Sequence, residues 1–258
     1  MPIIQSVERA LGILDLFDEY DKELKLTEIT KRMNLHKSTV HSLLKTLQKH
    51  HYIEQNNENG KYYLGMKLFE RGHYVIQNLD LRALARESLL TLAKVSGRTI
   101  HLVILDGREG IYIDKVENPN AAILYSRIGR RVPIHSSGAG KALVAFKEPA
   151  ELEKILDGYE YTKQTKNTLT DKETFLQELK TIKEQGYAID NEENEPGVCC
   201  VALPIRDYTG QVIAAISSST AANHLTNEEL EKIIESSKTT ADELSRKLGY
   251  DFHSILIN

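Results

Sequence analysis

The chain has 258 residues, of which 41% are hydrophobic and 27% charged, so it has room for one large domain or two modest ones and cannot be disordered throughout. It has no apolar run near the roughly 18 residues of a membrane helix, and its first residues lack the regions of a signal peptide, which predicts a cytoplasmic protein. The two cysteines, Cys199 and Cys200, are neighbours and cannot join distant segments.

The net charge of −4 hides an uneven distribution along the chain. Residues 25–51 carry six basic side chains against one acid, a net charge of +5, whereas residues 76–258 carry 22 basic and 27 acidic side chains. A small basic N-terminal part joined to a larger acidic body indicates that the two parts have different tasks.

The first 65 residues have the element order of a winged helix-turn-helix. Apolar residues at three- and four-residue spacing predict a helix over 7–17, a short second helix with Thr27 as its N-cap, and a third helix over 37–50. Two strand-like runs, 52–55 and 61–64, flank a loop rich in asparagine and glycine, which predicts a β-hairpin.

The helix predicted at 37–50 has two faces of different chemistry. At about 100° per residue, its apolar stripe points one way. The opposite side carries two serines and two lysines: Ser38, Ser42, Lys45 and Lys49. Short hydroxyls near the N-terminus and lysines further along are what a helix in the DNA major groove presents to base edges and phosphates. The alternative is a three-helix bundle with a solvated lysine face.

We predict a DNA-binding surface on this helix and the following hairpin. Its residues are Lys37, Ser38, Thr39, His41, Ser42, Lys45, Lys49 and Lys61. In the hairpin, Asn57, Asn59 and Tyr62 are also placed to reach a phosphate or the minor groove.

The pattern is helical again from Met66 to Val95, with interruptions expected near Gly72 and around 78–80. The predicted domains are therefore a DNA-binding domain at 1–65, a helical linker at 66–80 and a larger domain at 81–258. In the larger domain, strands are predicted at 99–106, 111–116, 121–128, 187–191, 198–206 and 211–219, and helices at 137–146, 149–156, 171–185 and 226–248. Hairpin-joined strands mixed with helices favour an antiparallel α+β fold over a doubly wound one.

The run Gly138-Ala-Gly-Lys141 has part of the pattern of a phosphate-binding loop. His135 stands where the leading glycine belongs, and Ala142 where a Ser or Thr should follow the lysine, which excludes ATPase and GTPase activity. Two interpretations of this run stay open. In the first, the N–H groups at the start of the glycine-rich helix bind a small carboxylate. In the second, the glycines only allow close packing.

A second polar cluster surrounds Asp190, Cys200 and the serines at 217–219. Ser217 and Ser219 share one face of a strand, where either a polar ligand or neighbouring carbonyl groups must satisfy them. Two adjacent cysteines without Cys or His at ligand spacing make a poor zinc site, so no metal is expected. A catalytic Cys–His pair is conceivable with His101, His135 or His224, but the spacing selects none of them.

Motifs in both halves of the chain resemble the IclR family of bacterial transcriptional regulators. In the N-terminal half these motifs are SVERALGIL at 6–14, LTEI at 26–29, KSTVHSLLKTL at 37–47 and YLG at 63–65. In the C-terminal half they are RVPIHSSGAGKAL at 131–143 and the stretch from Gly186 to Asp207. The chain departs from the family pattern at Ser42, where an arginine is frequent, and at Gly140, where a bulkier residue is frequent.

This resemblance implies a winged helix-turn-helix joined to a GAF-like effector-binding domain, an α+β architecture. It also implies an effector pocket formed by Leu124, Gly138, Ala139, Asp190, Cys200, Ser217 and Ser219. In that pocket the N–H groups of Gly138 and Ala139 would take a ligand carboxylate, and Asp190 and the serines its hydroxyl or keto groups.

We therefore expect a transcriptional regulator, with repression favoured over activation, that binds double-stranded operator DNA as a homodimer or homotetramer. A small organic acid would control its DNA affinity, with no cofactor, no catalysis and no membrane contact. The rival hypothesis is a GAF-like thiol enzyme, or a redox-sensing regulator, that uses Cys199 or Cys200.

Overall fold

The computed structural model describes residues 3–18, 20–77, 80–118 and 126–250. The chain divides into two compact units, Met1–Leu79 and Asp80–Asn258. Among the helices of the described residues, none is both long and apolar enough to cross a membrane.

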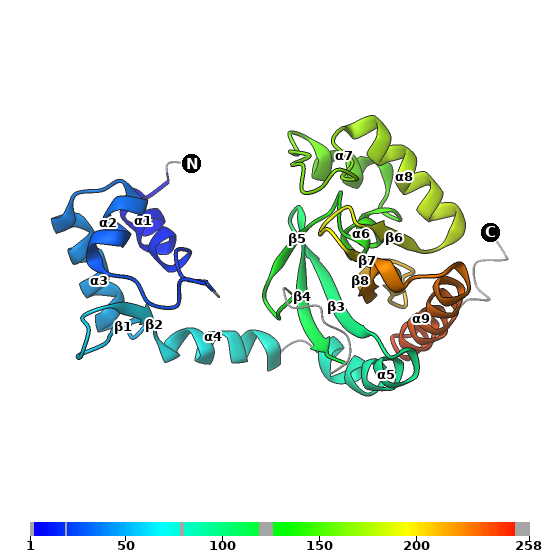
Figure 1. The fold of residues 1–258 in the computed structure, drawn as a ribbon, viewed down its shortest axis with the longest axis horizontal. Coiled ribbons are helices and arrows are strands. Elements are labelled where there is room, and N and C mark those ends of the chain that lie inside the picture. Colours follow the sequence, from blue (N-terminus) through cyan, green and yellow to red (C-terminus); the bar gives the residue numbers. More distant parts are fainter. Residues whose placement is uncertain (1–2, 19, 78–79, 119–125, 251–258) are drawn as a thin grey trace. The chain divides into compact units, whose positions relative to one another are not determined.

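The N-terminal unit contains three helices, a two-stranded hairpin and a fourth helix (Figure 1). In chain order these are α1 (Gln5–Leu14), α2 (Leu26–Met33), α3 (Lys37–Lys49), β1 (Ile53–Gln55), β2 (Tyr62–Leu64) and α4 (Met66–Gln77). Their core is apolar and fully buried, with Ile13, Ile29, Val40, Leu44 and Ile53 at its centre. These side chains come from α1, α2, α3 and β1, so the core holds the three helices and the hairpin together.

Several helix boundaries in the N-terminal unit differ from the predictions. Helix α1 spans Gln5–Leu14 where 7–17 was predicted. Helix α2 begins at Leu26, two residues earlier than predicted, and Thr27 lies inside it. The N-cap residue is Lys25, and the Glu28 carboxylate accepts the Lys25 N–H at 2.6 Å. Helix α4 runs through Gly72 without the expected interruption. A Cβ at Gly72 would meet nothing within 4 Å, so this glycine lowers helix propensity there but breaks no packing.

The C-terminal unit is built on a six-stranded antiparallel sheet in the order β5-β4-β3-β8-β7-β6. The strands are β3 (Thr99–Asp106), β4 (Glu109–Val116), β5 (Arg131–Pro133), β6 (Ala188–Asn191), β7 (Val198–Arg206) and β8 (Val212–Ala221). The antiparallel α+β architecture is confirmed. The strand expected at 121–128 is not: residues 126–128 are not extended strand, residues 121–125 lie outside the described part, and β5 forms the edge instead.

Helices cover both faces of this sheet (Figure 1). On one face lie α5 (Asp80–Ser96) and α9 (Asn227–Lys247), and on the other α6 (Gly138–Val144), α7 (Pro149–Leu156) and α8 (Lys172–Gln185), with a 3₁₀ turn at Ala222–His224. The alternation of β8 divides its serines between the two faces. The Ser218 hydroxyl lies 2.8 Å from that of Ser237 in α9, whereas Ser217 and Ser219 point toward the α6 side.

Candidate functional site

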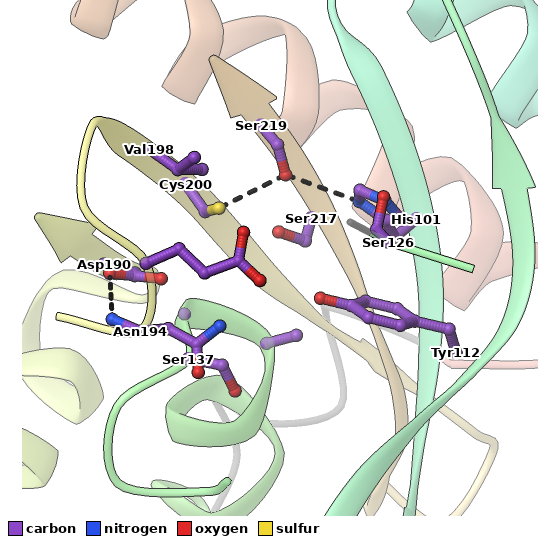
Figure 2. Close-up of a pocket in the computed structure, with 13 residues that line it drawn as sticks. His101, Tyr112, Ser126, Ser137, Asp190, Asn194, Val198, Cys200, Ser217 and Ser219 are labelled. Atoms are coloured by element: carbon purple, nitrogen blue, oxygen red, sulfur yellow. Dashed lines mark hydrogen bonds between the residues drawn. The ribbon is translucent and has the colours of Figure 1, made fainter. Parts of the chain in front are cut away.

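A cavity lies on the α6 side of the sheet, between the first turn of α6 and strands β3, β4, β7 and β8 (Figure 2). Its lining consists of His101, Tyr112, Ser126, Ser137, Gly138, Ala139, Asp190, Asn194, Glu195, Val198, Cys200, Ser217 and Ser219. The space open to the centre of a water molecule is about 20 Å³, which is room for one water. An organic ligand can therefore enter only if lining side chains move.

Six of the seven predicted effector residues line this one cavity: Gly138, Ala139, Asp190, Cys200, Ser217 and Ser219. The seventh, Leu124, lies outside the described residues. Sequence reasoning did not place seven others here: His101, Tyr112, Ser126, Ser137, Asn194, Glu195 and Val198. The strand register, in which His101 pairs with Ser217 and Cys200 with Ser219, places His101 among the predicted residues.

A chain of neutral hydrogen bonds forms one wall of the cavity (Figure 2). The Cys200 thiol donates to Ser219 Oγ at 3.2 Å, Ser219 Oγ is 3.4 Å from His101 Nδ1, and His101 Nε2 is 2.8 Å from Ser126 Oγ. Burial lowers the pKa of His101 to about 3, with a smaller contribution from the nearby Lys115 ammonium. The imidazole is therefore neutral and offers the wall one donor and one acceptor.

Asp190 forms the opposite wall, at the end of β6. Its Oδ1 accepts the N–H of Glu193 at 2.8 Å and that of Asn194 at 3.2 Å. Burial nevertheless raises its pKa to about 7, because removing the carboxylate from water outweighs these two bonds. Asp190 therefore changes its charge near neutral pH, directly against the cavity.

The glycines at the start of α6 have different roles. A Cβ at Gly140 would lie 2.6 Å from Ile134 Cα and from the Pro133 carbonyl oxygen, so this glycine permits close packing. A Cβ at Gly138 would meet Asp190 Cβ only at 3.5 Å, an ordinary contact. The Ser137 hydroxyl caps the helix by accepting the Gly140 N–H at 3.1 Å. The N–H groups of Gly138 and Ala139 also lie in the first turn of α6, where the helix itself provides no hydrogen-bond acceptor.

Lys141 is fully buried and is held by carboxylates. Its Nζ lies 2.8 Å from Glu193 and 2.9 Å from Glu178. Its ammonium thus anchors the β6–β7 loop, which carries Asn194 and Glu195, and is not aimed at a phosphate.

The two cysteines are not activated thiols. They point to opposite sides of β7: Cys199 is buried beside Asn191, and Cys200 lines the cavity. Burial raises the pKa of both thiols, and the Asp190 carboxylate raises them further. A thiol nucleophile requires the opposite shift.

All but one of the predicted DNA-binding residues lie on α3 in the N-terminal unit, and the exception, Lys61, directly precedes β2. Exposed side chains are Lys37, Ser38, His41, Ser42, Lys45 and Lys49, and half-buried ones are Thr39 and Lys61. The hairpin differs from expectation, because Tyr62 belongs to the core and the Asn59 amide donates to Glu23 at 3.1 Å. Tyr62 therefore cannot reach a phosphate.

Two family models match most of the chain. Residues 73–246 match the family model of the bacterial transcriptional regulator IclR C-terminal domain, and residues 6–57 match that of the IclR helix-turn-helix domain. The chain belongs to the IclR family. Its N-terminal helix-turn-helix domain therefore binds DNA, and its C-terminal domain binds small-molecule effectors.

IclR-family relatives match over nearly their full length. The HTH-type transcriptional regulator XynR of Escherichia coli (strain K12) is 55% identical over 250 residues, 97% of this chain and 99% of that protein. The HTH-type transcriptional repressor AllR of the same strain is 32% identical, over 96% of this chain and 92% of that protein. The crystal structure of Thermotoga maritima IclR has a TM-score of 0.77 at 35% identity, covering 95% of this chain and 99% of that one.

The described residues contain no group of three or more His, Cys, Asp or Glu side chains that could hold a metal ion. The cavity is lined by hydroxyls, an amide, a thiol, two acids, a neutral imidazole and the first residues of α6.

Proposed function

We propose that this IclR-family regulator is a repressor that binds operator DNA through α3 and changes its DNA affinity when a small organic acid occupies the cavity against Asp190. The cavity itself carries this proposal. It joins N–H donors at Gly138 and Ala139 to the hydroxyls of Ser217 and Ser219 in one enclosed space. The naming of the AllR relative as a repressor supports the sign of control.

The exposed face of α3 supports the mode of DNA binding. Val40 and Leu44 fix the helix to the core, which turns Ser38, Ser42 and Lys45 toward solvent. The Ser42 hydroxyl donates to the Ser38 carbonyl at 3.0 Å and keeps its lone pairs for a base or backbone donor. The lysines neutralise phosphates, so DNA affinity falls steeply with salt.

The N-terminal unit has apolar surface that supports a homodimer. Ile4, Val7 and Leu11 of the α1 region are more than half exposed, and so are Met66 and Phe69 of α4. Exposed apolar residues that recur along one helix face mark a protein interface. A dimer places two copies of α3 on two half-sites of the duplex.

The effector is a small organic acid that also carries hydroxyl or keto groups. The first N–H groups of α6 accept an anion, while Ser217, Ser219 and Tyr112 exchange hydrogen bonds with hydroxyls. The His101 imidazole supports the Ser219 hydroxyl from behind. No step of this recognition needs chemistry on the ligand.

Strand β4 links the cavity to α5, the helix at which the chain enters the C-terminal unit. A bulge pairs Tyr112 with Val103 but Asp114 with Leu102, so the two side chains lie on opposite faces of the sheet. Tyr112 lines the cavity, whereas Asp114 Oδ1 accepts from Arg86 of α5 at 2.9 Å. A ligand that displaces Tyr112 thereby shifts α5, and two α5 positions with different ligand affinities suffice for control of DNA binding.

The experiment is a thermal-shift screen of the full chain with short keto acids, sugar-derived acids and aromatic acids, followed by binding to a duplex selected from random sequence. The proposal expects an acid that raises the melting temperature and changes DNA affinity. Asp190→Ala removes the response and retains DNA binding. Turnover of the bound acid, or DNA binding unchanged by every stabilising acid, contradicts the proposal. Alkylation of Cys199 and Cys200 that alters neither readout also removes the thiol hypotheses.

A further inference from the structure

The lining of the cavity has the wrong charge for an acid. Its ionisable members include two carboxylic acids, Asp190 and Glu195, and a neutral imidazole, His101. Among the residues that the structure describes, the lining contains neither lysine nor arginine. An organic anion that entered this lining as it stands would meet like charge in a space largely shielded from water. The proposed effector therefore needs a cation that the lining does not itself contain.

Arg130 is a cation that pairs with a carboxylate of the cavity lining. Its Nη2 lies 2.9 Å from Oε1 of Glu195, and the two side chains are 33% and 21% exposed. A second cation behind the lining, Lys115, holds the Ser126 carbonyl and pairs with Glu117. Of these two cations, Arg130 is the one whose partner, Glu195, itself lines the cavity.

The backbone of Arg130 is fixed, so its position beside the cavity does not depend on the ion pair. Its carbonyl accepts the N–H of Tyr112 at 3.1 Å, and its own N–H donates to the Arg127 carbonyl at 3.1 Å. The Glu195 backbone is held as well, since its carbonyl accepts the Val198 N–H at 3.3 Å. The ion pair can thus open by rotation of side chains while both chain segments stay in place.

We propose that Glu195 is a resident anion, and that an acidic effector enters by replacing its carboxylate on Arg130. This inference rests on the proposed function and assigns to it a specificity residue, Arg130, and a competing group, Glu195. Release of Glu195 enlarges a cavity that otherwise holds one water. It also gives an incoming carboxylate a bidentate partner. An uncharged analogue gains nothing from the exchange, so the pair selects for anions.

The two substitutions have opposite effects. Glu195→Gln keeps the shape of the side chain and removes the competing carboxylate, so the affinity for an acidic ligand should rise about tenfold. Arg130→Gln removes the cation, so the affinity for the same ligand should fall about tenfold, which is the effect of one charge-assisted hydrogen bond. A carboxylate that served only as an acceptor for ligand hydroxyls would give the reverse result for Glu195→Gln. The control is the neighbouring cluster in which Arg131 pairs with Asp106 at 2.5 Å and with Glu109 at 3.4 Å, and none of these three residues lines this cavity.

The test is isothermal titration of the full chain with pyruvate, gluconate and 4-hydroxybenzoate, each compared with its uncharged amide. Wild type, Glu195→Gln, Glu195→Ala, Arg130→Gln, Arg131→Gln and Glu109→Gln are measured after a thermal melt has established that each is folded. The inference predicts tighter acid binding by both Glu195 variants, weaker acid binding by Arg130→Gln, and changes within about twofold for the controls and the amides.

Equal acid binding by wild type, Glu195→Gln and Arg130→Gln overturns the inference and leaves the proposed function intact. Weaker acid binding by both Glu195 variants overturns it too. If none of the three acids binds wild type or either Glu195 variant, the proposed acid effector fails and the inference fails with it.

Discussion

Replacing Lys141 by Met tests how the cavity is held in place. The ammonium is fully buried and pairs with Glu193 at 2.8 Å and Glu178 at 2.9 Å. Removal of one partner from a buried ion pair costs about 3–5 kcal/mol, because the remaining charge is unpaired. At about 2–4 °C per kcal/mol for a unit of this size, the melting temperature should fall by roughly 6–20 °C.

The loss of stability in Lys141→Met should depend on pH, because Glu193 becomes neutral, and no longer needs a cation, when it takes up a proton. Burial already raises its pKa, and the Lys141 ammonium lowers it again. Without the lysine this carboxyl stays protonated to a higher pH, so Lys141→Met should lose less stability at pH 5 than at pH 8. Adding Glu193→Gln to Lys141→Met should recover part of the loss at pH 8.

Melting curves at the two pH values, with Lys172→Met as control, provide the assay. Lys172 pairs with Glu153 at 2.7 Å, but both side chains are largely exposed, at 36% and 66%, so its loss should cost about 0–1 kcal/mol. A drop for Lys141→Met no larger than that for Lys172→Met at pH 8 would refute the reasoning.

Three further predictions concern DNA binding, pH and packing. Lys45→Gln should weaken DNA binding and lower the slope of log affinity against log salt by about 1, by fluorescence anisotropy, whereas Lys232→Gln should not; equal effects would contradict the docking face. Burial raises the pKa of Asp190 from 3.8 to about 7. Between these two pH values the folded chain keeps a proton on Asp190 that the unfolded chain releases, so the free energy of unfolding falls as pH rises from about 4 to 7. Asp190→Asn should therefore gain stability relative to wild type from pH 5 to pH 8 in urea titrations, and a constant difference would count against the assignment. Gly140→Ala should lose about 1–3 kcal/mol through its clash with Ile134, whereas Gly72→Ala, with nothing within 4 Å of its Cβ, should lose none; similar urea midpoints for the two variants would contradict the packing argument.

Local patterns predicted most of the elements, because capping and periodicity act over a few residues. The last helix begins where Thr226 caps it by accepting the Glu229 N–H at 3.2 Å, and β7 has its predicted bounds. The α2 boundary was wrong by two residues, because the N-cap residue is Lys25, whose N–H bonds to the Glu28 carboxylate three positions further along the chain. Short β5 was missed, since three residues give too little alternation to detect.

The site was predictable only in part, because its members come from strands that are distant in sequence. The motifs around Gly138 and Asp190 are local and could be recognised. His101 and Tyr112 enter through the β3–β8 register and the bulge in β4, which a single sequence does not specify. The burial of Lys141 likewise depends on acids 37 and 52 positions away, so a glycine-lysine pair alone gave no sign of it.

Thermodynamic coupling between acid binding and DNA binding tests the central claim most directly. Titration of the selected duplex with and without saturating acid gives one coupling factor, and titration of the acid with and without saturating duplex gives another. If the cavity controls DNA binding, the two factors are equal and differ from one, and Asp190→Ala brings both to one while its DNA affinity without acid is unchanged. An acid that binds the cavity tightly but leaves the affinity for the duplex unchanged would contradict the account.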